Sequence, residues 1–500
     1  MSEELQTLPI GIQSFEMLRK RGHLYVDKTA RLMELVSSDR CFLSRPRRFG
    51  KSLTLSTLDA MFRGKVELFK GLAAEAWVAE QAKRPAPVLR LDMSMMDVRD
   101  VACFEKNLVA ELTDRSHRHG ITLTRSDADE PGGAFKGMIS GLYDQGGPVV
   151  VLIDEYDKPI LDKIGNLEAA EAMREALRTL YTVLKGCDEY LRFVMLTGIS
   201  RFTRTGVFSA MNNLRDISMS ESFGDIVGYT QEELEADFAG WIGAAAEKMN
   251  ATRETLLERM KDYYDGFCFD GKTRLYNPFS ILNFLADRKF KNYWYHSGSP
   301  TFILSYLRSH GIDDPEVYRH KSVPADFADS QEIERAKPES FLFQSGYLTI
   351  ESAEEQELTL DYPNREVLNA ISRLYLDNVY RVEGFTALGS NLWRALKDGD
   401  IDGAVKLYNT ALSCIPYEDF TRQNESLYRS LFLMLLRGAG ITANGEVHTH
   451  RGRSDVLVRF PERVVVLEFK LVRGAGEAER LRGEGRLQIE EKGYAKPFAA

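Results

Sequence analysis

Short apolar strands alternate with helical stretches through the first 225 residues, and this alternation constrains the fold more than any other feature. Such alternation is typical of a parallel sheet covered by helices. We therefore expect an α/β fold built on a parallel sheet. The expected strands are Cys41–Ser44, Pro87–Met93, Val149–Ile153 and Arg192–Thr197, and the expected helices are Ser52–Phe62, Cys103–His117 and Leu167–Leu184.

Beyond residue 225 the pattern becomes mainly helical. From Thr230 to about residue 310 the chain is rich in aromatic residues, and Thr230 followed by Glu233 predicts a capping box at the start of this stretch. Residues 311–345 are more polar and contain three prolines, which indicates a connecting region. Further helices are expected at 365–382, 385–412 and Glu425–Gly438, and a loop is expected at 122–134.

Composition narrows the class of protein. Five hundred residues are too many for one hydrophobic core and suggest two to four domains. The longest apolar runs are far too short to span a membrane, and the N-terminus lacks the layout of a signal peptide. Five cysteines without a CxxC pair argue against a zinc site or a disulfide framework. We expect a cytoplasmic protein with no membrane partner.

Residues 42–52, FLSRPRRFGKS, have the pattern of a strand, a short loop and the start of a helix. In a phosphate-binding loop, backbone N–H groups and the helix N-terminus hold the phosphates. Lys51 would reach the β- and γ-phosphate oxygens, and the hydroxyl of Ser52 would bind Mg²⁺. The usual GxxxxGK[ST] pattern lacks its first glycine because Arg45 stands there. The tight first turn must then form in another way, with Pro46 as a candidate.

The loop also contains three arginines. Arg45, Arg47 and Arg48 either add positive charge around the phosphates or lie on the surface. Phe49 and Gly50 complete the loop before the helix. We expect the whole stretch, residues 45–52, to bind a nucleotide.

A second element supports the nucleotide site. The apolar strand Val149–Ile153 runs into Asp154 and Glu155. Asp154 would hold Mg²⁺ through water, and Glu155 would orient or activate the attacking water. The alternative is a strand followed by a helix cap, because Asp is common at such positions. Together with the loop about 100 residues earlier, the pair favours ATP binding and hydrolysis.

The strand that follows along the chain ends in polar residues. Thr197 or Ser200 could sense the γ-phosphate, and Arg201 or Arg204 could neutralise developing charge. Each of them is also an ordinary loop residue. Their expected position at the carboxyl edge of the sheet is what makes them candidates.

Residues 451–470, RGRSDVLVRFPERVVVLEFK, predict a β-hairpin with strands Ser454–Phe460 and Arg463–Leu471. If Pro461 and Glu462 form a two-residue turn, Asp455 stands directly opposite Glu468. Opposed residues of an antiparallel pair have Cβ atoms about 5 Å apart. Lys470 projects from the same face as Glu468 because it is two residues further on.

Two carboxylates and an ammonium among apolar residues are costly to bury without a bound cation. Asp455 and Glu468 would hold one or two Mg²⁺ ions, and Lys470 would position or stabilise the nucleophile. Glu425, on the preceding helix, could lend a third carboxylate. The alternative is a surface hairpin with a cross-strand ion pair. A basic helix is expected to follow at Glu477–Gly493, with Gln488 in it and Tyr494 just beyond.

With these motifs in view, the chain resembles, across nearly its full length, the bacterial and archaeal AAA-ATPase-like proteins that have a C-terminal PD-(D/E)xK nuclease-like domain. The matching segments before residue 240 are LPIGIQSFEMLRKRGHLYVDKT, RPRRFGKSL, VVVLIDEYDKPI, LTGISRFTRTGVFSAMNNL and FGDIVGYTQEEL. The later ones are YYDGFCFDG, YNPFSILNFL, NYWYHSG, FLFQSGYLTI, YPNREV, SCIPYED, NESLYRSLFLMLL, GRSDVLV and LEFKL.

The resemblance implies ATP at Lys51, Ser52, Asp154 and Glu155, and a loop that lacks the first glycine in this family too. It implies a metal at Asp455 and Glu468, with Lys470 as the third signature residue. It also suggests Glu425, Gln488 and Tyr494 as supporting residues of the nuclease motif.

The expected domains follow from the same resemblance. They are a P-loop ATPase domain at 1–225, a helical lid region at 226–330, a connector at 331–384 and a nuclease-like α/β domain at 385–500. Nuclease-like domains continue with a further strand after the helix that contains the glutamine, and only Ala495–Ala500 remain here. The last domain is therefore expected to be incomplete at its C-terminal end.

Three functions remain open at this point. The first is an ATP-regulated, Mg²⁺-dependent nuclease acting on DNA. The second is an ATP-driven switch or signalling module whose nuclease-like domain is inactive and only binds nucleic acid or a partner. The third is a remodeller that acts on proteins. A homo-oligomer would be natural if an arginine completes the ATP site of a neighbouring copy.

Overall fold

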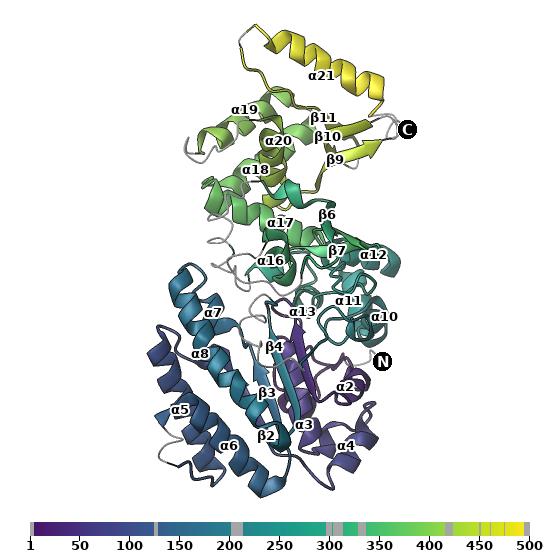
Figure 1. Ribbon diagram of the computed structural model, residues 1–500. Coiled ribbons are helices and arrows are strands. Elements are labelled where there is room, and N and C mark those ends of the chain that lie inside the picture. The colour runs from purple at the N-terminus through teal and green to yellow at the C-terminus, as the bar shows by residue number, and fades with distance from the viewer. Residues whose placement is uncertain are drawn as a thin grey trace. The chain divides into compact units, whose positions relative to one another are not determined.

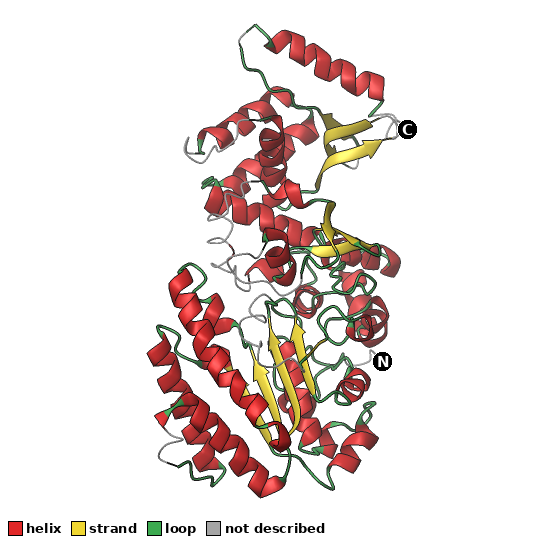
Figure 2. Ribbon diagram, viewed as in Figure 1, coloured by secondary structure: helices red, strands yellow, loops and turns green. Residues whose placement is uncertain are grey.

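The chain divides into two compact units, Met1–Ser297 with His320–Asn364 and Gly298–Arg319 with Arg365–Ala500. Figure 1 follows the chain through both units, and Figure 2 distinguishes helices from strands. These units do not follow the boundaries of the four predicted domains, and that division stays a prediction. The computed structural model describes residues 5–124, 129–201, 214–296, 303, 314–328, 337–415, 424–449, 452–460, 462–474 and 476–494.

The first unit is built on a parallel five-stranded sheet in the order β2-β3-β4-β1-β5. The predicted parallel α/β fold is therefore confirmed, and each of the four predicted strands is present. The short strand β5 was not predicted. The strands are β1 (Arg40–Ser44), β2 (Val88–Asp92), β3 (Val149–Asp154), β4 (Leu191–Gly198) and β5 (Arg215–Asp216).

Helices cover the sheet, and all six residues of β3 are buried. Helix α3 lies against β2 and β3, α6 lies against β3, and α5, α6 and α8 pack together (Figure 1). The carboxyl ends of β1, β3 and β4 meet at one edge, which is where parallel sheets bind ligands. The helices are α1 (Phe15–Lys20), α2 (Thr29–Leu35), α3 (Lys51–Phe62), α4 (Glu75–Gln81), α5 (Val101–Arg118), α6 (Pro131–Gly146), α7 (Lys158–Leu161) and α8 (Leu167–Gly186), with short 3-10 turns η1 (Val66–Leu68), η2 (Met93–Met95), η4 (Asp188–Tyr190) and η5 (Glu221–Phe223).

Helix α6 shows that the loop predicted at 122–134 extends too far. The helix begins at Pro131, where a proline is well tolerated because the first helical N–H needs no partner, and the preceding Glu130 is extended. Glycines at positions 132 and 133 made this start resemble a loop. The buried residues of the helix recur at helical spacing: Ala134, Phe135, Met138, Ile139 and Leu142.

The helical region that follows the sheet begins as predicted. Thr230 accepts a hydrogen bond from the Glu233 backbone while the Glu233 side chain accepts one from the Thr230 backbone, which is the expected capping box. The hydrophobic core of this region includes Leu8, Leu24 and Val26, so the N-terminal segment is part of it. Its helices are α10 (Gln231–Asp237), α11 (Ala239–Lys248), α12 (Arg253–Tyr264), α13 (Pro278–Asp287) and α14 (Tyr293–His296).

A small antiparallel sheet in the order β6-β8-β7 ends the first unit. Among the described residues of the predicted connecting region, 311–345, the chain forms a short 3-10 turn (Pro315–Tyr318), one of these strands and a helix. The elements are β6 (Lys321–Pro324), α16 (Pro338–Gln344), β7 (Thr349–Ala353) and β8 (Glu357–Asp361).

The second unit begins with helices and ends with a three-stranded antiparallel sheet, β11-β10-β9, and a final helix. The chain is helical in the stretches predicted at 365–382, 385–412 and 425–438. The stretch at 385–412 consists of two helices, however, because Gly399, in the left-handed region at φ +80°, ends the first of them. The elements are η6 (Pro315–Tyr318), α17 (Arg365–Leu374), the π-helical turn η8 (Tyr375–Val379), α18 (Phe385–Asp398), α19 (Ile401–Ser413), α20 (Glu425–Gly438), β9 (Ala443–Thr449), β10 (Gly452–Arg459), β11 (Val464–Leu467) and α21 (Ala478–Lys492).

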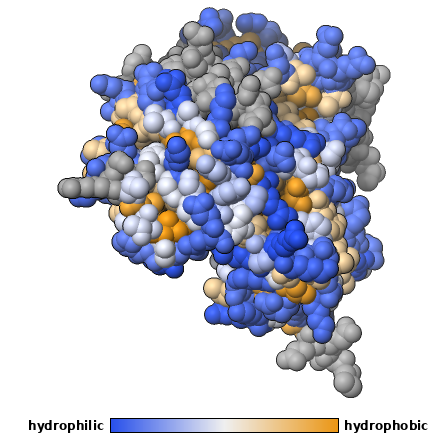
Figure 3. Space-filling model, turned by 60° about the horizontal axis from the view of Figure 1, so that its bottom comes forward, coloured by the Kyte–Doolittle hydropathy of each residue, from blue (hydrophilic) through white to orange (hydrophobic). Residues whose placement is uncertain are grey.

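The surface is mainly polar in the view of Figure 3, where hydrophobic side chains form small separate groups. Within the part of the chain that the structure describes, we find no helix with the length and apolarity needed to cross a bilayer.

Candidate functional site

The predicted phosphate-binding loop joins β1 to α3. Gly50 precedes the helix in the left-handed region, at φ +96°, which a residue with a Cβ adopts only with strain. Helix α3 then begins at Lys51, whose ammonium donates to the carbonyl oxygens of Arg45 (2.8 Å) and Pro46 (2.9 Å). Burial lowers the pKa of Lys51, and the nearby carboxylates of Glu155 and Asp154 oppose this shift. The Lys51 ammonium is therefore hydrogen-bonded to the backbone of the predicted phosphate-binding loop.

The predicted carboxylate pair lies at the end of β3, where Asp154 is the last residue of the strand and Glu155 follows it. Asp154 is buried, and its Oδ1 accepts hydrogen bonds from Thr197 Oγ1 (2.7 Å) and from the Glu155 backbone (3.1 Å). Glu155 lies beside it in the left-handed region at φ +48°. Burial raises the pKa of Glu155, and the charge of Lys51 opposes the shift. The structure therefore brings the loop lysine, both carboxylates and Thr197 to one edge of the sheet.

Asp157 is a buried residue at this edge that the sequence analysis missed. Its Oδ2 accepts three hydrogen bonds, from the backbone of Ile199 (3.0 Å) and from the backbone and hydroxyl of Ser200 (both 2.6 Å). Burial raises the pKa of Asp157, while the bonds from Ser200 oppose the shift. Ser200, predicted as a phosphate sensor, is thus held by a carboxylate. The sequence did contain a sign of this residue, because Asp157 is the third acidic residue of the segment IDEYD, residues 153–157.

A cleft of about 360 Å³ opens at the start of α3. Its volume falls in the range of roughly 300–1,000 Å³ that ligand pockets occupy. Four cationic side chains and one carboxylate line it, a balance that suits a polyanion. The charged lining residues are Arg47, Arg48, Lys51, Lys158 and Glu155; the others are Pro9, Gly11, Ile12, Gln13, Gly50, Ser52, Leu53, Tyr229, Pro278, Phe279 and Leu282.

The N-terminal segment was not predicted to contribute to this site, yet Pro9 and Ile12 line the cleft together with Phe279 of α13. Arg48 places its guanidinium 4.8 Å from the centre of the Phe279 ring. The lining of the cleft therefore combines cationic side chains of the loop with an apolar side formed by Pro9, Ile12 and Phe279. The residues of this apolar side are far from the loop in sequence, so a search for local motifs does not connect them with the loop.

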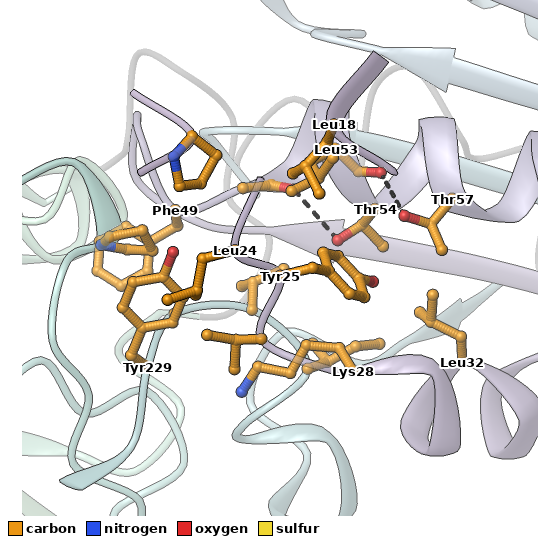
Figure 4. A pocket seen from close by; sticks show the side chains of 17 residues that line it. Leu18, Leu24, Tyr25, Lys28, Leu32, Phe49, Leu53, Thr54, Thr57 and Tyr229 are labelled. Atoms are coloured by element: carbon orange, nitrogen blue, oxygen red, sulfur yellow. Dashed lines mark hydrogen bonds between the residues drawn. The ribbon is translucent and has the colours of Figure 1, made fainter. Parts of the chain in front are cut away.

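A second, smaller cavity of about 70 Å³ lies behind the loop. Figure 4 shows Phe49, Tyr25 and Tyr229 around it, together with the first turns of α3. Its volume is far below the range of ligand pockets, and its lining is mostly apolar. Phe49 is buried, packs edge-on against the rings of Phe267 and Phe269, and lines this smaller cavity.

Arg45 was predicted either to add charge around the phosphates or to lie on the surface, and the structure supports neither prediction. Its side chain is buried and is not among the residues that line the cleft. It is 1% exposed, and its guanidinium lies 4.5 Å from the centre of the Phe269 ring. Nη1 donates to the carbonyl oxygens of Ser44 (3.0 Å) and Ser218. Burial lowers the pKa of Arg45 to about 10. Where the usual pattern has its first glycine, this chain has a buried cation that ties the loop to the segment after β5.

Arg201 also lies outside the lining of the cleft. Its guanidinium forms an ion pair with Asp216 of β5 at 3.0 Å and donates to the carbonyl of Ala328 at 3.0 Å. Its backbone N–H donates to the Gln344 side chain at 2.7 Å. A role for Arg201 in binding stays a prediction, and the alternative candidate Arg204 lies outside the described residues.

The predicted hairpin has the predicted register. Val456 pairs with Leu467 and Arg459 with Val464, and the Phe460 N–H donates to the Arg463 carbonyl at 2.8 Å. The same register continued by one residue sets Asp455 opposite Glu468. Strand β11 ends at Leu467, however, so the strand predicted at Arg463–Leu471 is shorter than expected and Glu468 lies just beyond it.

The two carboxylates have well-defined contacts. Oδ1 of Asp455 lies 3.1 Å from Nη1 of Arg429, and Oδ2 accepts the Phe469 N–H at 2.8 Å. Oε1 of Glu468 accepts from the Lys470 ammonium at 2.9 Å. The Asp455 side chain is 14% exposed and that of Glu468 is 4% exposed. Such burial argues against the alternative prediction, in which these residues form a cross-strand ion pair on the surface.

One oxygen of this cluster fits a cation. Oε2 of Glu468 is buried and has no hydrogen-bond partner among the described residues. Burial raises the pKa of Glu468, Lys470 opposes that shift, and the charge of Asp455 adds to it. Burial is the largest single influence on the pKa of Lys470 and lowers it, but the bond to Glu468 and the charges of the nearby carboxylates together outweigh burial and raise this pKa. A buried, unpaired carboxylate oxygen beside a second carboxylate is a donor set that suits Mg²⁺.

Three further predicted residues lie on or next to α20 and α21, the helices beside this hairpin in sequence. Oε2 of Glu425, in the first turn of α20, accepts the Leu471 N–H at 3.2 Å. Gln488 of α21 donates to the Tyr494 hydroxyl at 3.4 Å, and Tyr494 is buried. A methyl group at Gly485 would lie 3.6 Å from Cγ of Lys470, so α21 rests against the cluster at that turn.

Sequence reasoning did not single out two residues of this site. Arg429, one turn after Glu425 on α20, supplies the cation next to Asp455. Its signal was the spacing of four residues within a helix, which places both side chains on one face. The close approach of Gly485 carried no signal, because a lone glycine in a helical pattern does not show what lies against it.

Comparison with known proteins yields two family matches. A model described as predicted AAA-ATPase matches residues 9–208. A model described as PD-(D/E)XK nuclease superfamily matches residues 423–500. The first match includes the phosphate-binding loop and the carboxylate pair after β3, and the second includes α20, the hairpin and α21.

Individual proteins are similar as well. A protein from Azotobacter chroococcum mcd 1, described as an uncharacterized protein in the vnfD 5′ region, is 34% identical over 507 residues, which cover 99% of this chain and 94% of that protein. Among solved structures, the Aeropyrum pernix Orc1 protein in complex with DNA matches with a TM-score of 0.26 and 9% identity, covering 69% of this chain and 92% of that one. We draw no argument from a structural similarity this low.

Proposed function

Because the chain belongs to the family of predicted AAA-ATPases that carry a C-terminal domain of the PD-(D/E)XK nuclease superfamily, we propose that it binds and hydrolyses ATP and cleaves DNA with Mg²⁺. One observation carries the nuclease part of this proposal. Asp455 of β10 and Glu468, just beyond the end of β11, lie in one cluster with Lys470, and Oε2 of Glu468 is buried without a hydrogen-bond partner among the described residues.

The cleft at the start of α3 supports ATP as the nucleotide. Lys51 would exchange the backbone carbonyls that it now contacts for the β- and γ-phosphate oxygens. Arg47 and Arg48 would add positive charge around the phosphates. The apolar side of the cleft, formed by Pro9, Ile12 and Phe279, would cover the base.

The residues around β3 would serve hydrolysis. Ser52 and Asp154 supply the hydroxyl and carboxylate oxygens that Mg²⁺ takes up in such sites. Thr197 holds the Asp154 carboxylate in place through its 2.7 Å hydrogen bond. Glu155 would orient the attacking water, and its raised pKa suits a group that accepts a proton.

The nuclease-like cluster would act on a phosphodiester. Bound Mg²⁺ would polarise the phosphate and lower the pKa of a water, which is the chemistry that hydrolysis needs. Asp455 and Glu468 would hold the ion, with Glu425 as a third carboxylate nearby. Lys470 would position the attacking water or stabilise charge on the phosphate. Gln488 and Tyr494 would support the face that α21 presents to this cluster.

The proposal is tested with the full-length protein on labelled linear and circular DNA, and on RNA of the same sequence, with Mg²⁺ and with or without ATP. We expect cleavage of DNA that requires Mg²⁺ and that Lys470→Ala abolishes while ATP hydrolysis continues. Arg459→Ala is a matched control, because Arg459 is an exposed cation of the same hairpin. Absence of cleavage by the wild-type protein under all these conditions would contradict the proposal.

One observation favours a second function, an ATP-driven switch with an inactive nuclease-like domain. Both oxygens of Asp455 already have partners, Arg429 and the Phe469 N–H. A domain held in this way would bind nucleic acid or a partner without cutting it. DNA binding that weakens with salt, together with intact ATP turnover and no cleavage, would identify this function.

A further inference from the structure

A second cluster of metal-binding residue types lies in the first unit, apart from both proposed sites. Nδ1 of His320 lies 2.7 Å from Oε2 of Glu351 and 3.7 Å from Oδ2 of Asp361. The three donor atoms all lie within 4.8 Å of one another. Within the described part of the chain, this is the one group of three His, Cys, Asp or Glu side chains that meets so closely.

The backbone brings these side chains together at the small sheet β6-β8-β7. Asp361 is the last residue of β8. Glu351 lies in β7 between Ile350 and Ser352, where the pairing with β8 shifts register, and such bulges redirect side chains. His320 precedes β6 in the left-handed region, at φ +49°, which is uncommon for a residue with a Cβ.

A simple ion pair explains only part of this arrangement. An imidazole and one carboxylate would suffice for the 2.7 Å contact between His320 and Glu351. Asp361 brings a second carboxylate to the same nitrogen, and like charges this close repel each other. A divalent cation held by all three groups would offset that repulsion.

We propose that His320, Glu351 and Asp361 form a binding site for a divalent transition-metal ion, with Zn²⁺ as the best fit. Zn²⁺ binds imidazole nitrogen and carboxylate oxygen at about 2.0–2.2 Å, and three protein ligands with water in the remaining position are common. Mg²⁺ is a poorer fit because it prefers oxygen ligands alone. The scattered cysteines argued against a zinc site, but none of the three ligands proposed here is a cysteine.

The site also fits in its access and in its place in the fold. The side chains of His320 and Glu351 are 58% and 39% exposed, so an ion can reach them from solvent. Asp361 is mostly buried, and its Oδ1 accepts the Tyr362 N–H at 2.7 Å, which anchors one ligand. The bound ion would tie the turn before β6 to β7 and β8. It would therefore stabilise the first unit, independently of the proposed ATPase and nuclease functions.

The test is a calorimetric Zn²⁺ titration of chelator-treated, full-length protein. It uses a Glu468→Gln background, which removes one carboxylate of the nuclease-like cluster and so weakens that cluster as a competing site. We expect His320→Ala and Glu351→Gln to weaken one Zn²⁺ site roughly tenfold or more. We also expect Zn²⁺ to raise the melting temperature of the parent but not of these variants. His117→Ala, an exposed histidine on α5, is the matched control.

Glu351→Gln keeps the shape of the side chain, so a folding defect in His320→Ala does not decide the result. Equal Zn²⁺ affinity in the parent, His320→Ala and Glu351→Gln would overturn the proposal. Absence of a Zn²⁺-dependent rise in the parent's melting temperature would overturn it as well, and would identify the contact as an ion pair only.

Discussion

The guanidinium of Arg429 lies 3.1 Å from Oδ1 of Asp455, and both side chains are largely buried. A predicted metal ligand is therefore held by a cation of the protein itself. Because two cations cannot share the same oxygen cheaply, we expect Arg429 and a bound Mg²⁺ to compete for Asp455. If the cluster binds metal as proposed, Arg429 would adjust its metal affinity without being a ligand itself.

Arg429→Met tests this competition. Without metal, the variant leaves Asp455 without its charged partner, and we expect a loss of about 1.5–3 kcal/mol in the free energy of unfolding. Mg²⁺ should then raise the melting temperature of the variant more than that of the wild-type protein. Thermal unfolding in EDTA and in Mg²⁺ measures both effects.

The control for this prediction is Arg486→Met on α21. Arg486 is 83% exposed and pairs with Glu490 one turn away, so its loss should change little. An equal response to Mg²⁺ in the wild-type protein and Arg429→Met would show that Arg429 does not compete with the ion.

Lys51→Ala should weaken ATP binding by at least about tenfold, because the ammonium is the central cation of the phosphate-binding loop. Titration with a fluorescent ATP analogue measures this change. Lys83→Ala is the matched control, since Lys83 is 71% exposed. Unchanged affinity in Lys51→Ala would place the nucleotide elsewhere.

Gly50→Ala should destabilise the first unit by about 1–2 kcal/mol, because the residue sits at φ +96°. A Cβ at Gly50 would meet no atom within 4 Å, so backbone strain is the cause to be measured. Gly165→Ala, which also has open space but no positive φ, should leave stability nearly unchanged. Denaturant unfolding of both variants compares them, and equal stabilities would rule out strain at Gly50.

Asp157 gives a prediction about pH. Its folded-state pKa is raised above the ordinary value of 3.8 because burial disfavours the charged form. The stability of the first unit should therefore fall as the pH rises from about 3.8 through the raised pKa, and then level off. Asp157→Asn removes this titration and keeps an oxygen for Ile199 and Ser200. The stability of the variant relative to the wild-type protein should thus improve over that interval.

Melting temperatures of the wild-type protein, Asp157→Asn and the control Asp114→Asn across this pH range measure the effect. Asp114 is 52% exposed and pairs with Arg118 on the same helix. A difference between the wild-type protein and Asp157→Asn that stays constant with pH would contradict the assignment.

Features set by local rules were predicted from the sequence. The register that opposes Asp455 and Glu468 follows from the period of two in a strand and from a short turn. The capping box at Thr230 follows from two residues three positions apart. Both depend on neighbours in the chain, which a single sequence displays.

Features set by distant contacts were not predicted. Arg45 is buried because Phe269 and Ser218 surround it, and neither is near it in sequence. Pro9 and Phe279 likewise line the same cleft although they are far apart in sequence. A sequence shows which residues could perform chemistry, but packing decides which of them face the same space.

The central claim is that Asp455 and Glu468 hold Mg²⁺ for phosphodiester cleavage. Its most direct test is the initial rate of cleavage of end-labelled duplex DNA, with Mg²⁺ and ATP, by the wild-type protein and by Glu468→Gln. We predict Mg²⁺-dependent cleavage by the wild-type protein and a rate lower by about 100-fold or more in Glu468→Gln. Equal rates in the two proteins, or no cleavage by the wild-type protein, would contradict the claim.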